Sequence, residues 1–393
     1  MRVLIGAVGL AGHTLPAIAL ARELRARGHG VLFHGFERWR ATVEELEIGF
    51  EGGRDRIFAS IDESEPSLAD SVRGLMPSIE RFRPDMVVSD GLTLSPALAA
   101  EVRGIPRATL LPEVYPFAAP GLPFFSLGLY PPRTAWGAAA WRAAAPLRTR
   151  LPSTGWLRQS RRSLDLQRAE LGLGPQPDFD RPSGDRLILV ATLPQLEYTR
   201  RWPADVHVTG PMFFDPRHPA VDLPDGEGPL VVVAPSTVKD PEGRLVRTAL
   251  EALAPEPLRI VVTTGGATAD IDRIPANVLI ADWIDYSRVM RQASLVICHG
   301  NHGTLARALS EGVPLAISPA MADDAEHGAR VAWAGAGLMI PRPLLAPASL
   351  RSVTRRLLTD VRFAERARAI GAWAREHDGP RVAADLVEGH ATG

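Results

Sequence analysis

The chain has 393 residues, with 44 Lys+Arg against 45 Asp+Glu, and this length suits two domains of roughly 150–200 residues each. A formal charge of −1 argues against a broad electrostatic footprint for nucleic acid or for an anionic membrane. The single cysteine, Cys298, excludes an internal disulfide framework and any cysteine-rich metal site. We therefore expect a globular protein of a reducing compartment, with a cytoplasmic location.

Lysine usage excludes several enzyme classes, because Lys239 is the only lysine in the chain. The residue directly before this lysine is not a glycine, so a phosphate-binding loop of the GxxxxGK[ST] type is absent. None of the four tyrosines has a lysine four residues later, so the tyrosine–lysine pair of many oxidoreductases is missing as well. No apolar run reaches the roughly 18 residues that a membrane span needs, and we expect no transmembrane segment.

Short apolar runs alternate with helical patterns, which predicts an α/β fold with parallel sheets. The first helix has Pro16 in its first turn, and Gly28 ends it. A second, short helix is expected at residues 96–102. The strands expected in this half are residues 3–6, 31–34, 86–89, 108–111, 187–191 and 206–209.

Residues 213–229 are rich in Pro, Asp and Gly and show no periodicity, which is typical of a linker. The pattern then restarts, and two such halves predict two Rossmann-like, doubly wound domains that face each other across a cleft. We expect domains at 1–212 and 230–375, with a C-terminal helix in 376–393 that packs back on the first domain. The second half is expected to have strands at 230–234, 259–263, 278–280, 295–298 and 315–318, and helices at 241–253, up to 309 and from about 325.

The segment CHGNHGT, which begins at Cys298, ends a buried strand and opens a helix. A helix N-terminus offers free N–H groups and the positive end of a dipole, which suits a phosphate. Thr304 can add a hydroxyl donor, and His299 can donate from its ring to a charged oxygen. An ordinary strand–helix turn with glycines for its geometry fits the segment equally well.

His13 and Asp90 follow two strands at the carboxyl edge of the first sheet, where open α/β folds bind ligands. The helix dipole at His13 is expected to lower the pKa of its imidazole, so that the ring is a neutral base at physiological pH. A buried Asp90 could hold an imidazole in one tautomer and stabilise its protonated form. The structural alternative for each residue is a helix cap.

Asp323 and Asp324 open a later helix, where carboxylates accept from ligand hydroxyls or cap the helix. Trp283 follows a strand and suits either a flat base or ordinary packing.

The glycines of residues 6–12 resemble a dinucleotide-binding turn. The DxD sequence at 270–272 has no third ligand nearby, so we expect no metal site. The arginine-rich residues 133–168 suit a membrane surface or two solvated helices.

Together these clusters resemble the family 1 glycosyltransferases with the two-Rossmann GT-B fold. The resemblance is strongest to bacterial enzymes that glycosylate antibiotics and other lipophilic natural products. It is carried by GHTLPAIALARELRARGH near the N-terminus and by HGNHGTLARALSEGVPLAISPAMADD in the second half. ADWIDYSRVM before the second tract and VAWAGAG after it extend the match.

The resemblance implies a role for each matching position. His13 is the general base, and Asp90 orients it. In the loop at 114–130, the expected acceptor-binding residues are Tyr115, Phe117, Phe124 and Phe125, although a loop that only packs against the domain fits this run equally well. The expected donor-binding residues are Ser236, Thr237, Trp283, Ile284, His299, Gly300, Asn301, His302, Gly303, Thr304, Asp323 and Asp324.

Three positions depart from the family pattern. Asn301 replaces the second glycine of the HGG sequence, and we expect it to adopt the same left-handed backbone. Asp324 replaces the usual glutamine, which changes an amide donor into an acceptor-only group. Arg307 replaces the usual glutamate of the EAL segment. The changes at Asp324 and Arg307 bear on the identity of the donor sugar more than on the reaction.

The implied reaction is an inverting transfer of a sugar from a UDP- or dTDP-sugar to a lipophilic small-molecule acceptor. It implies neither a metal nor a cofactor and no nucleic acid partner, and it leaves a monomer and a homodimer equally open. Three alternatives remain at this level. They are a GT-B transferase with a membrane lipid as acceptor, an NAD(P)-dependent oxidoreductase that uses residues 6–12, and a degenerate GT-B protein without turnover, which Asp324 motivates.

Overall fold

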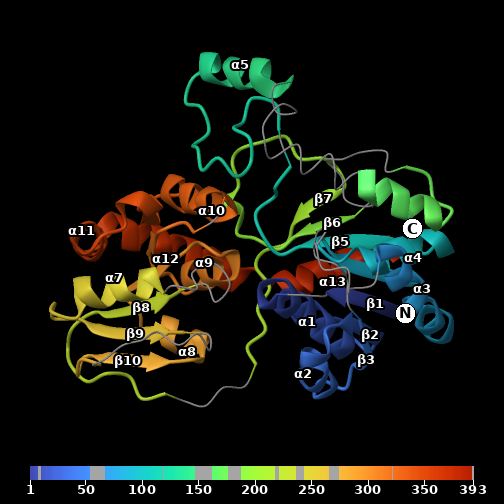
Figure 1. Ribbon diagram of the computed structural model, residues 1–393, viewed down its shortest axis with the longest axis horizontal. Coiled ribbons are helices and arrows are strands. Elements are labelled where there is room, and N and C mark those ends of the chain that lie inside the picture. The colour runs from blue at the N-terminus through green and yellow to red at the C-terminus, as the bar shows by residue number, and fades with distance from the viewer. Residues whose placement is uncertain are drawn as a thin grey trace.

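The computed structural model describes residues 1–7, 10–53, 67–117, 119–146, 162–175, 187–216, 221–235, 243–264, 274–320 and 322–391. Two sheets, one of seven strands and one of six, form the centres of two α/β domains (Figure 1). All strand pairs in both sheets are parallel. The fold class expected from the sequence is therefore confirmed.

The N-terminal sheet has the order β3-β2-β1-β4-β5-β6-β7, so the chain reverses direction across the sheet between β1 and β4. Ligands of open parallel sheets bind at the carboxyl ends of the strands at such a reversal. Its strands are β1 (Arg2–Ala7), β2 (Gly30–Gly35), β3 (Gly49–Gly52), β4 (Met86–Asp90), β5 (Arg107–Leu111), β6 (Ile188–Val190) and β7 (Val206–Val208). Its helices are α1 (Ala11–Ala26), η1 (Glu37–Trp39), α2 (Arg40–Glu44), α3 (Leu68–Phe82), α4 (Leu94–Arg103), α5 (Ala135–Ala144) and η4 (Pro194–Leu196).

Gly6, near the end of β1, illustrates how a motif residue can serve packing. A Cβ at this position would lie 2.3 Å from Cγ of Pro96 in α4. Only glycine lets α4 approach β1 this closely. The first glycine of the dinucleotide-like pattern at residues 6–12 thus has a structural reason that involves no ligand.

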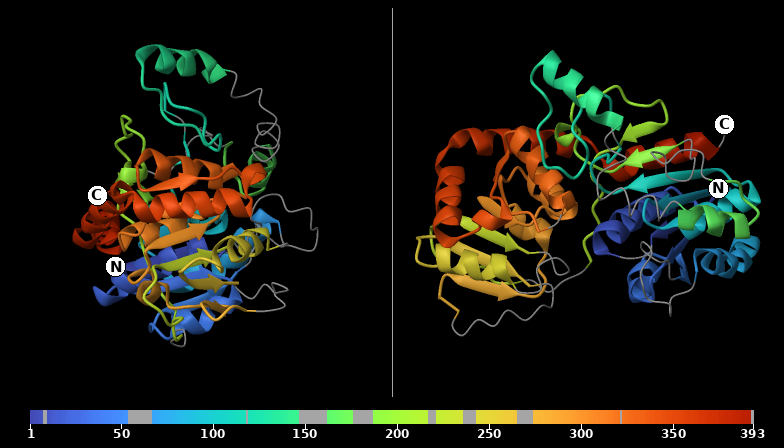
Figure 2. Two further views of the ribbon diagram at one scale, coloured as in Figure 1. Left: turned by 90° about the vertical axis from the view of Figure 1, so that its left-hand side faces the viewer. Right: turned by 45° about the horizontal axis from the view of Figure 1, so that its top comes forward.

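The C-terminal sheet has the order β10-β9-β8-β11-β12-β13. Helices flank it, and the last of them lead the chain back toward the N-terminal domain (Figures 1 and 2). Its strands are β8 (Leu230–Ala234), β9 (Arg259–Thr263), β10 (Val278–Ala281), β11 (Leu295–Cys298), β12 (Leu315–Ile317) and β13 (Gly337–Met339). The helices are α7 (Arg244–Leu253), α8 (Tyr286–Met290), α9 (His302–Ser310), α10 (Ala322–Trp333), η5 (Arg342–Leu344), α11 (Pro347–Thr359), α12 (Val361–Glu376) and α13 (Gly379–Ala391).

The C-terminal helix α13 packs against α1 of the other domain. Ala383, Ala384 and Val387 are fully buried in the N-terminal core. Nη1 of Arg27 donates to Oδ1 of Asp385 at 2.6 Å, at the rim of the same contact. The chain thus ends on the domain in which it begins.

Helix α5 stands apart from both sheets (Figures 1 and 2). None of its residues is buried, and Trp136 is 87% exposed. This helix lies in the arginine-rich stretch 133–168, of which residues 147–161 are outside the described part of the chain. Within the described residues, the structure has no helix that is both long and apolar enough to cross a bilayer.

Two glycines in α13 provide a matched test of the contact between α13 and the N-terminal domain. A Cβ at Gly379 would lie 2.4 Å from the carbonyl oxygen of Pro211, whereas a Cβ at Gly389 would meet nothing within 4 Å. Gly379→Ala is expected to destabilise the fold by roughly 1–3 kcal/mol through overpacking. Gly389→Ala is expected to be neutral or to stabilise it by up to about 1 kcal/mol, because alanine favours helix.

Urea unfolding followed by far-UV circular dichroism measures both effects. Equal midpoints for the two variants would contradict the close approach at Gly379.

Candidate active site

His13 lies in the first turn of α1, directly after β1, and contacts the end of β4. Its Nδ1 is 2.7 Å from Oδ1 of Asp90, whose side chain is fully buried. Oδ2 of Asp90 accepts from the backbone N–H of Leu92 at 3.1 Å and from the hydroxyl of Thr93 at 3.2 Å. A carboxylate can only accept, so Nδ1 of His13 carries the proton and Nε2 is the basic nitrogen of the neutral ring.

The expectation that the pKa of His13 is lowered is wrong. Burial lowers it and is the largest single influence, but the negative charges and the hydrogen bond around the ring together outweigh burial and raise the pKa of His13 to about 8, with the charge of Asp90 the largest of them. The hydrogen bond to Asp90 and the charges of Glu113 and Asp323 act in the same direction.

The Gly-rich segment forms the N-terminus of α9, and its backbone differs from the expectation. Gly300 has φ +104°, and a Cβ there would lie 2.9 Å from the carbonyl oxygen of Asp324, so glycine is required. Asn301 is the N-cap residue with φ −62° and ψ 134°, an extended conformation. The expected left-handed backbone at Asn301 is therefore wrong, and the left-handed position is one residue earlier. Gly303 is exposed, with open space around its Cα, and Thr304 is half-buried beside it.

Two histidines of this segment are buried and have different partners. Nδ1 of His299 lies 2.9 Å from the carbonyl oxygen of Ser318, to which it donates. Nε2 of His302 lies 2.8 Å from the hydroxyl of Thr192, which follows β6 of the other domain. Burial lowers the pKa of His302 well below its usual range, and the nearby His327 and His13 lower it further. The neutral His302 ring thus joins α9 to the N-terminal domain, and its side chain does not face the solvent.

The other expected donor residues lie in different environments. Trp283 follows β10 and is 51% exposed, whereas the side chain of Ile284 is buried in the core beneath it. Ile284 can therefore reach a ligand only through its backbone. Ser236 and Thr237 lie outside the described residues.

Asp323 and Asp324 lie in the first turn of α10 but differ in exposure. Asp324 is fully buried, and its Oδ2 accepts from the backbone N–H of Ala320 at 3.2 Å. Asp323 is half-buried and contributes to the raised pKa of His13. Asp323 is therefore the member of the pair that lies near the candidate base.

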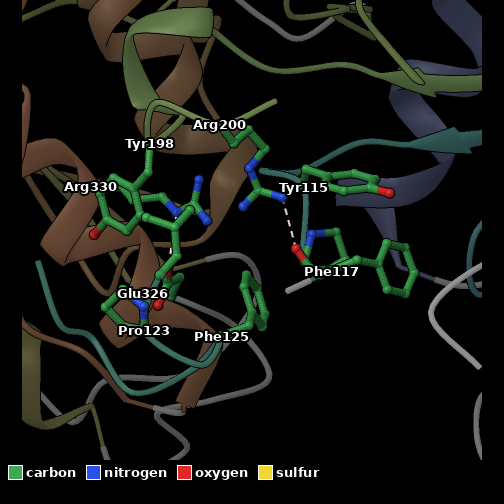
Figure 3. Close-up of a pocket in the computed structure, with 10 residues that line it drawn as sticks. Tyr115, Phe117, Pro123, Phe125, Tyr198, Arg200, Glu326 and Arg330 are labelled. Carbon is green, nitrogen blue, oxygen red and sulfur yellow. Dashed lines mark hydrogen bonds and ion pairs between the residues drawn. The ribbon is translucent and has the colours of Figure 1, made fainter. Parts of the chain in front are cut away.

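Three of the four expected acceptor residues line one small cavity between the domains (Figure 3). They are Tyr115, Phe117 and Phe125. Phe124 instead packs edge-to-face against Trp141 of α5, with ring centroids 5.3 Å apart.

Sequence patterns miss the charged residues around this cavity and around His13. Glu113 follows β5 and is close enough to raise the pKa of His13. Arg200, Glu326 and Arg330 line the cavity but come from distant parts of the chain. The sequence could have marked Glu113 as a site residue by its position. It follows the expected strand 108–111, at the same carboxyl edge of the sheet as Asp90.

The sequence of this chain is similar to those of proteins with known functions. Residues 247–388 match the family model described as erythromycin biosynthesis protein CIII-like, C-terminal domain. The chain is 28% identical over 425 aligned positions to 4'-demethylrebeccamycin synthase of Lentzea aerocolonigenes, with 99% of each chain covered. It is also 28% identical to O-mycaminosyltylonolide 6-deoxyallosyltransferase of Streptomyces fradiae, with 99% of this chain and 97% of that protein covered.

Solved structures show the same fold over the whole chain. The glycotransferase of kitacinnamycin superposes with a TM-score of 0.80 at 22% identity and covers 99% of both chains. The glycosyltransferase VinC in complex with dTDP superposes with a TM-score of 0.72 at 20% identity and covers both chains completely. The chain is a glycosyltransferase with the GT-B fold. These comparisons support a glycosyltransferase instead of the NAD(P)-dependent oxidoreductase that residues 6–12 suggested.

The described part of this glycosyltransferase contains no group of three or more His, Cys, Asp or Glu side chains that could hold a metal ion. The DxD sequence at 270–272 lies outside that part.

The raised pKa of His13 in this glycosyltransferase depends on Asp90, which a single substitution tests. In Asp90→Asn the attractive charge is gone and burial remains, so the pKa of His13 is expected to fall from about 8 by at least about one unit. Long-range ¹H–¹⁵N NMR of the imidazole, assigned with His13→Ala, measures both values.

Asp385→Asn, at the α13 contact, is the matched control and is expected to leave the His13 titration unchanged. An unchanged pKa in Asp90→Asn would contradict the assignment of the shift to this pair.

Proposed function

We propose that the enzyme transfers a sugar from a UDP- or dTDP-sugar to a hydroxyl group of a lipophilic natural product, with inversion at the sugar C1. The observation that carries this proposal is the pairing of His13 with Asp90, beside the open N-terminus of α9. A base and an anion-binding helix end are the two parts that such a displacement needs.

The names of similar proteins support the choice of donor and acceptor. VinC, which has the same fold, holds dTDP in its solved complex. The two relatives are named for rebeccamycin and tylonolide chemistry, which supports a natural-product acceptor here. Trp283, half exposed after β10, is proposed to stack on the base of the nucleotide.

In the proposed reaction, Nε2 of His13 removes the proton of the acceptor hydroxyl as that oxygen attacks C1 of the sugar. The C1–O bond to the diphosphate breaks on the opposite face, and the nucleoside diphosphate leaves with the electron pair. Asp90 holds the ring by its Nδ1–H and stabilises the imidazolium that forms. Only the neutral form of the His13 ring can accept a proton. This form predominates above a pH of about 8 in the free enzyme, so base catalysis is expected to be fastest there.

The departing diphosphate is proposed to meet the N–H groups at the start of α9, around Gly303, and the hydroxyl of Thr304. Nδ1 of His299 donates to the carbonyl oxygen of Ser318, and Nε2 is the ring atom proposed to contact the phosphate. Asp323 is proposed to accept from sugar hydroxyls, since it lies near the base. We propose that these groups stabilise the charge without a metal ion or a cofactor.

Calorimetric titration with dTDP, UDP and NAD tests the donor site. We expect dTDP or UDP to bind and NAD not to bind, and we expect His299→Ala to weaken binding at least about tenfold, equivalent to about 1.4 kcal/mol. His377→Ala, at the distant end of α12, is the matched control. Binding of NAD alone, or equal binding by His299→Ala, would contradict the proposed donor site.

The pH dependence of kcat/KM tests the base. We expect kcat/KM to rise with pH and to level off above about 8, because His13 must lose its proton. In Asp90→Asn the rise is expected at lower pH, with a plateau about 10²–10⁴-fold lower. His13→Ala is expected to remove the rise altogether. A profile in His13→Ala that keeps the wild-type inflection would show that another group is the base.

A further inference from the structure

A buried arginine between two glutamates joins the domains next to the expected acceptor residues. Figure 3 shows Glu326 and Arg330 on α10, facing the loop that follows β5. Nη1 of Arg330 donates to Oε2 of Glu197 at 2.8 Å, and its Nε donates to Oε1 of Glu326 at 2.9 Å. Glu197 directly follows η4 of the N-terminal domain. All three side chains are buried, and each strongly disfavours being left alone in the interior, so this ion triad fixes α10 against the N-terminal domain.

Both carboxylates of the triad also bind the loop at 114–130, one near each of its ends. Oε1 of Glu197 accepts from the backbone N–H of Tyr115 at 2.6 Å. Near the other end, the backbone N–H of Gly128 hydrogen-bonds to the carboxylate of Glu326. The arginine between the two carboxylates is thus connected to both ends of the loop that carries the expected acceptor residues.

Two further contacts hold the second end of this loop against α10. The hydroxyl of Tyr198 donates to the carbonyl oxygen of Leu129 at 3.0 Å, and the guanidinium of Arg330 lies over the ring of Tyr198. Gly128 has φ +63°, and a Cβ there would lie 3.0 Å from both the Cβ and the carbonyl oxygen of Ala325. The loop therefore contacts the first turn of α10 directly after the two aspartates.

The same turn of α10 carries Asp323, which is close enough to His13 to raise the pKa of its imidazole. The loop, the proposed sugar-binding carboxylate and the proposed base therefore meet at one end of α10. A shift of the loop relative to α10 would change the distance between an acceptor on the loop and a sugar at Asp323. Misplacing reactants by about 1 Å can lower a rate by about 10²-fold.

We propose that Arg330 is a positioning residue, which holds the loop at 114–130 at a fixed distance from the first turn of α10 and thereby determines the affinity for the acceptor. It acts through Glu197 and Glu326, which bind the loop directly. The acceptor site then depends on both domains, although the expected acceptor residues all lie in the first. This inference rests on the proposed function, because it assumes that the acceptor binds on this loop and the sugar at Asp323.

Two glycines with nearly the same backbone angle test the contact between the loop and α10. Gly128 and Gly104 have φ +63° and +66°, so alanine strains both positions alike. Only Gly128 lies against α10, whereas a Cβ at Gly104 would meet nothing within 4 Å. In Gly128→Ala we expect binding of 7-hydroxycoumarin, a lipophilic ring with a phenolic hydroxyl, to weaken about fivefold or more through overpacking, with unchanged binding of dTDP. Gly104→Ala is expected to bind both ligands as the wild type does.

Arg330→Lys tests the triad itself without leaving a buried carboxylate unpaired. The lysine keeps the positive charge, but its single nitrogen lacks the fork by which the arginine holds two carboxylates. We expect backbone amide exchange around Tyr115 and Gly128 to become about tenfold faster or more, and 7-hydroxycoumarin to bind more weakly, with unchanged binding of dTDP. Arg351→Lys, in the ion pair with Glu256, is the matched control and is expected to behave as the wild type.

Three measurements give these values. Fluorescence titration measures binding of 7-hydroxycoumarin, calorimetry measures binding of dTDP, and hydrogen exchange followed by mass spectrometry measures the opening of the loop. None of them requires that a sugar is transferred.

The outcomes separate this inference from the proposed function. Faster exchange confined to the loop, with weaker binding of 7-hydroxycoumarin and unchanged binding of dTDP, supports the inference even where no sugar is transferred. The absence of transfer then counts against the proposed function alone. Equal losses of affinity for both ligands, or a lower melting temperature with wild-type affinity for 7-hydroxycoumarin, would show that the triad only stabilises the fold and would overturn the inference. Identical behaviour of Gly128→Ala and Gly104→Ala would overturn it as well.

Discussion

The hydrogen bond between His13 and Asp90 exists because β1 and β4 are neighbours in a parallel sheet. Their register pairs Gly6 with Ser89, so the residues that follow both strands emerge side by side at the carboxyl edge. An antiparallel pairing would place the two side chains at opposite ends of the sheet. The order of the strands thus bears directly on the charge of the imidazole, because Asp90 is the strongest of the groups that raise the pKa of His13 above its usual value.

Contacts between the domains determine what faces this pair. His302, at the first turn of α9, bonds to Thr192 of the N-terminal domain, and Arg330 of α10 bonds to Glu197. A buried ion pair of this kind contributes little net stability, because both charges lose their hydration. It does impose a geometry, since each partner strongly disfavours being left alone in the interior. The result is that both helices that carry the proposed donor residues are held at a defined distance from the base.

Much of the fold could be predicted from the sequence, because buried parallel strands are continuous apolar runs. The expected bounds of β8, β9 and β11 agree with the structure to the residue. The strands β3 and β13 escaped prediction, since GFEG and GLM are too short and glycine-rich to show an apolar run. The site was harder. The pKa of His13 depends on Asp90, 77 positions away, and Arg330 pairs with Glu197 only across the domain boundary, where no local pattern exists.

The path of the chain at its C-terminus has a consequence for recombining such enzymes. Exchanging the second half of the molecule at the 213–229 linker alone would also exchange α13, whose Ala383, Ala384 and Val387 belong to the N-terminal core. A chimera made with one junction would thus carry a foreign helix inside its N-terminal domain, however well its C-terminal domain folds. A clean exchange takes two junctions, the second in the short connection between α12 and α13. Exchanging the C-terminal domain of this scaffold is therefore an insertion of one domain into another, and not a fusion of two.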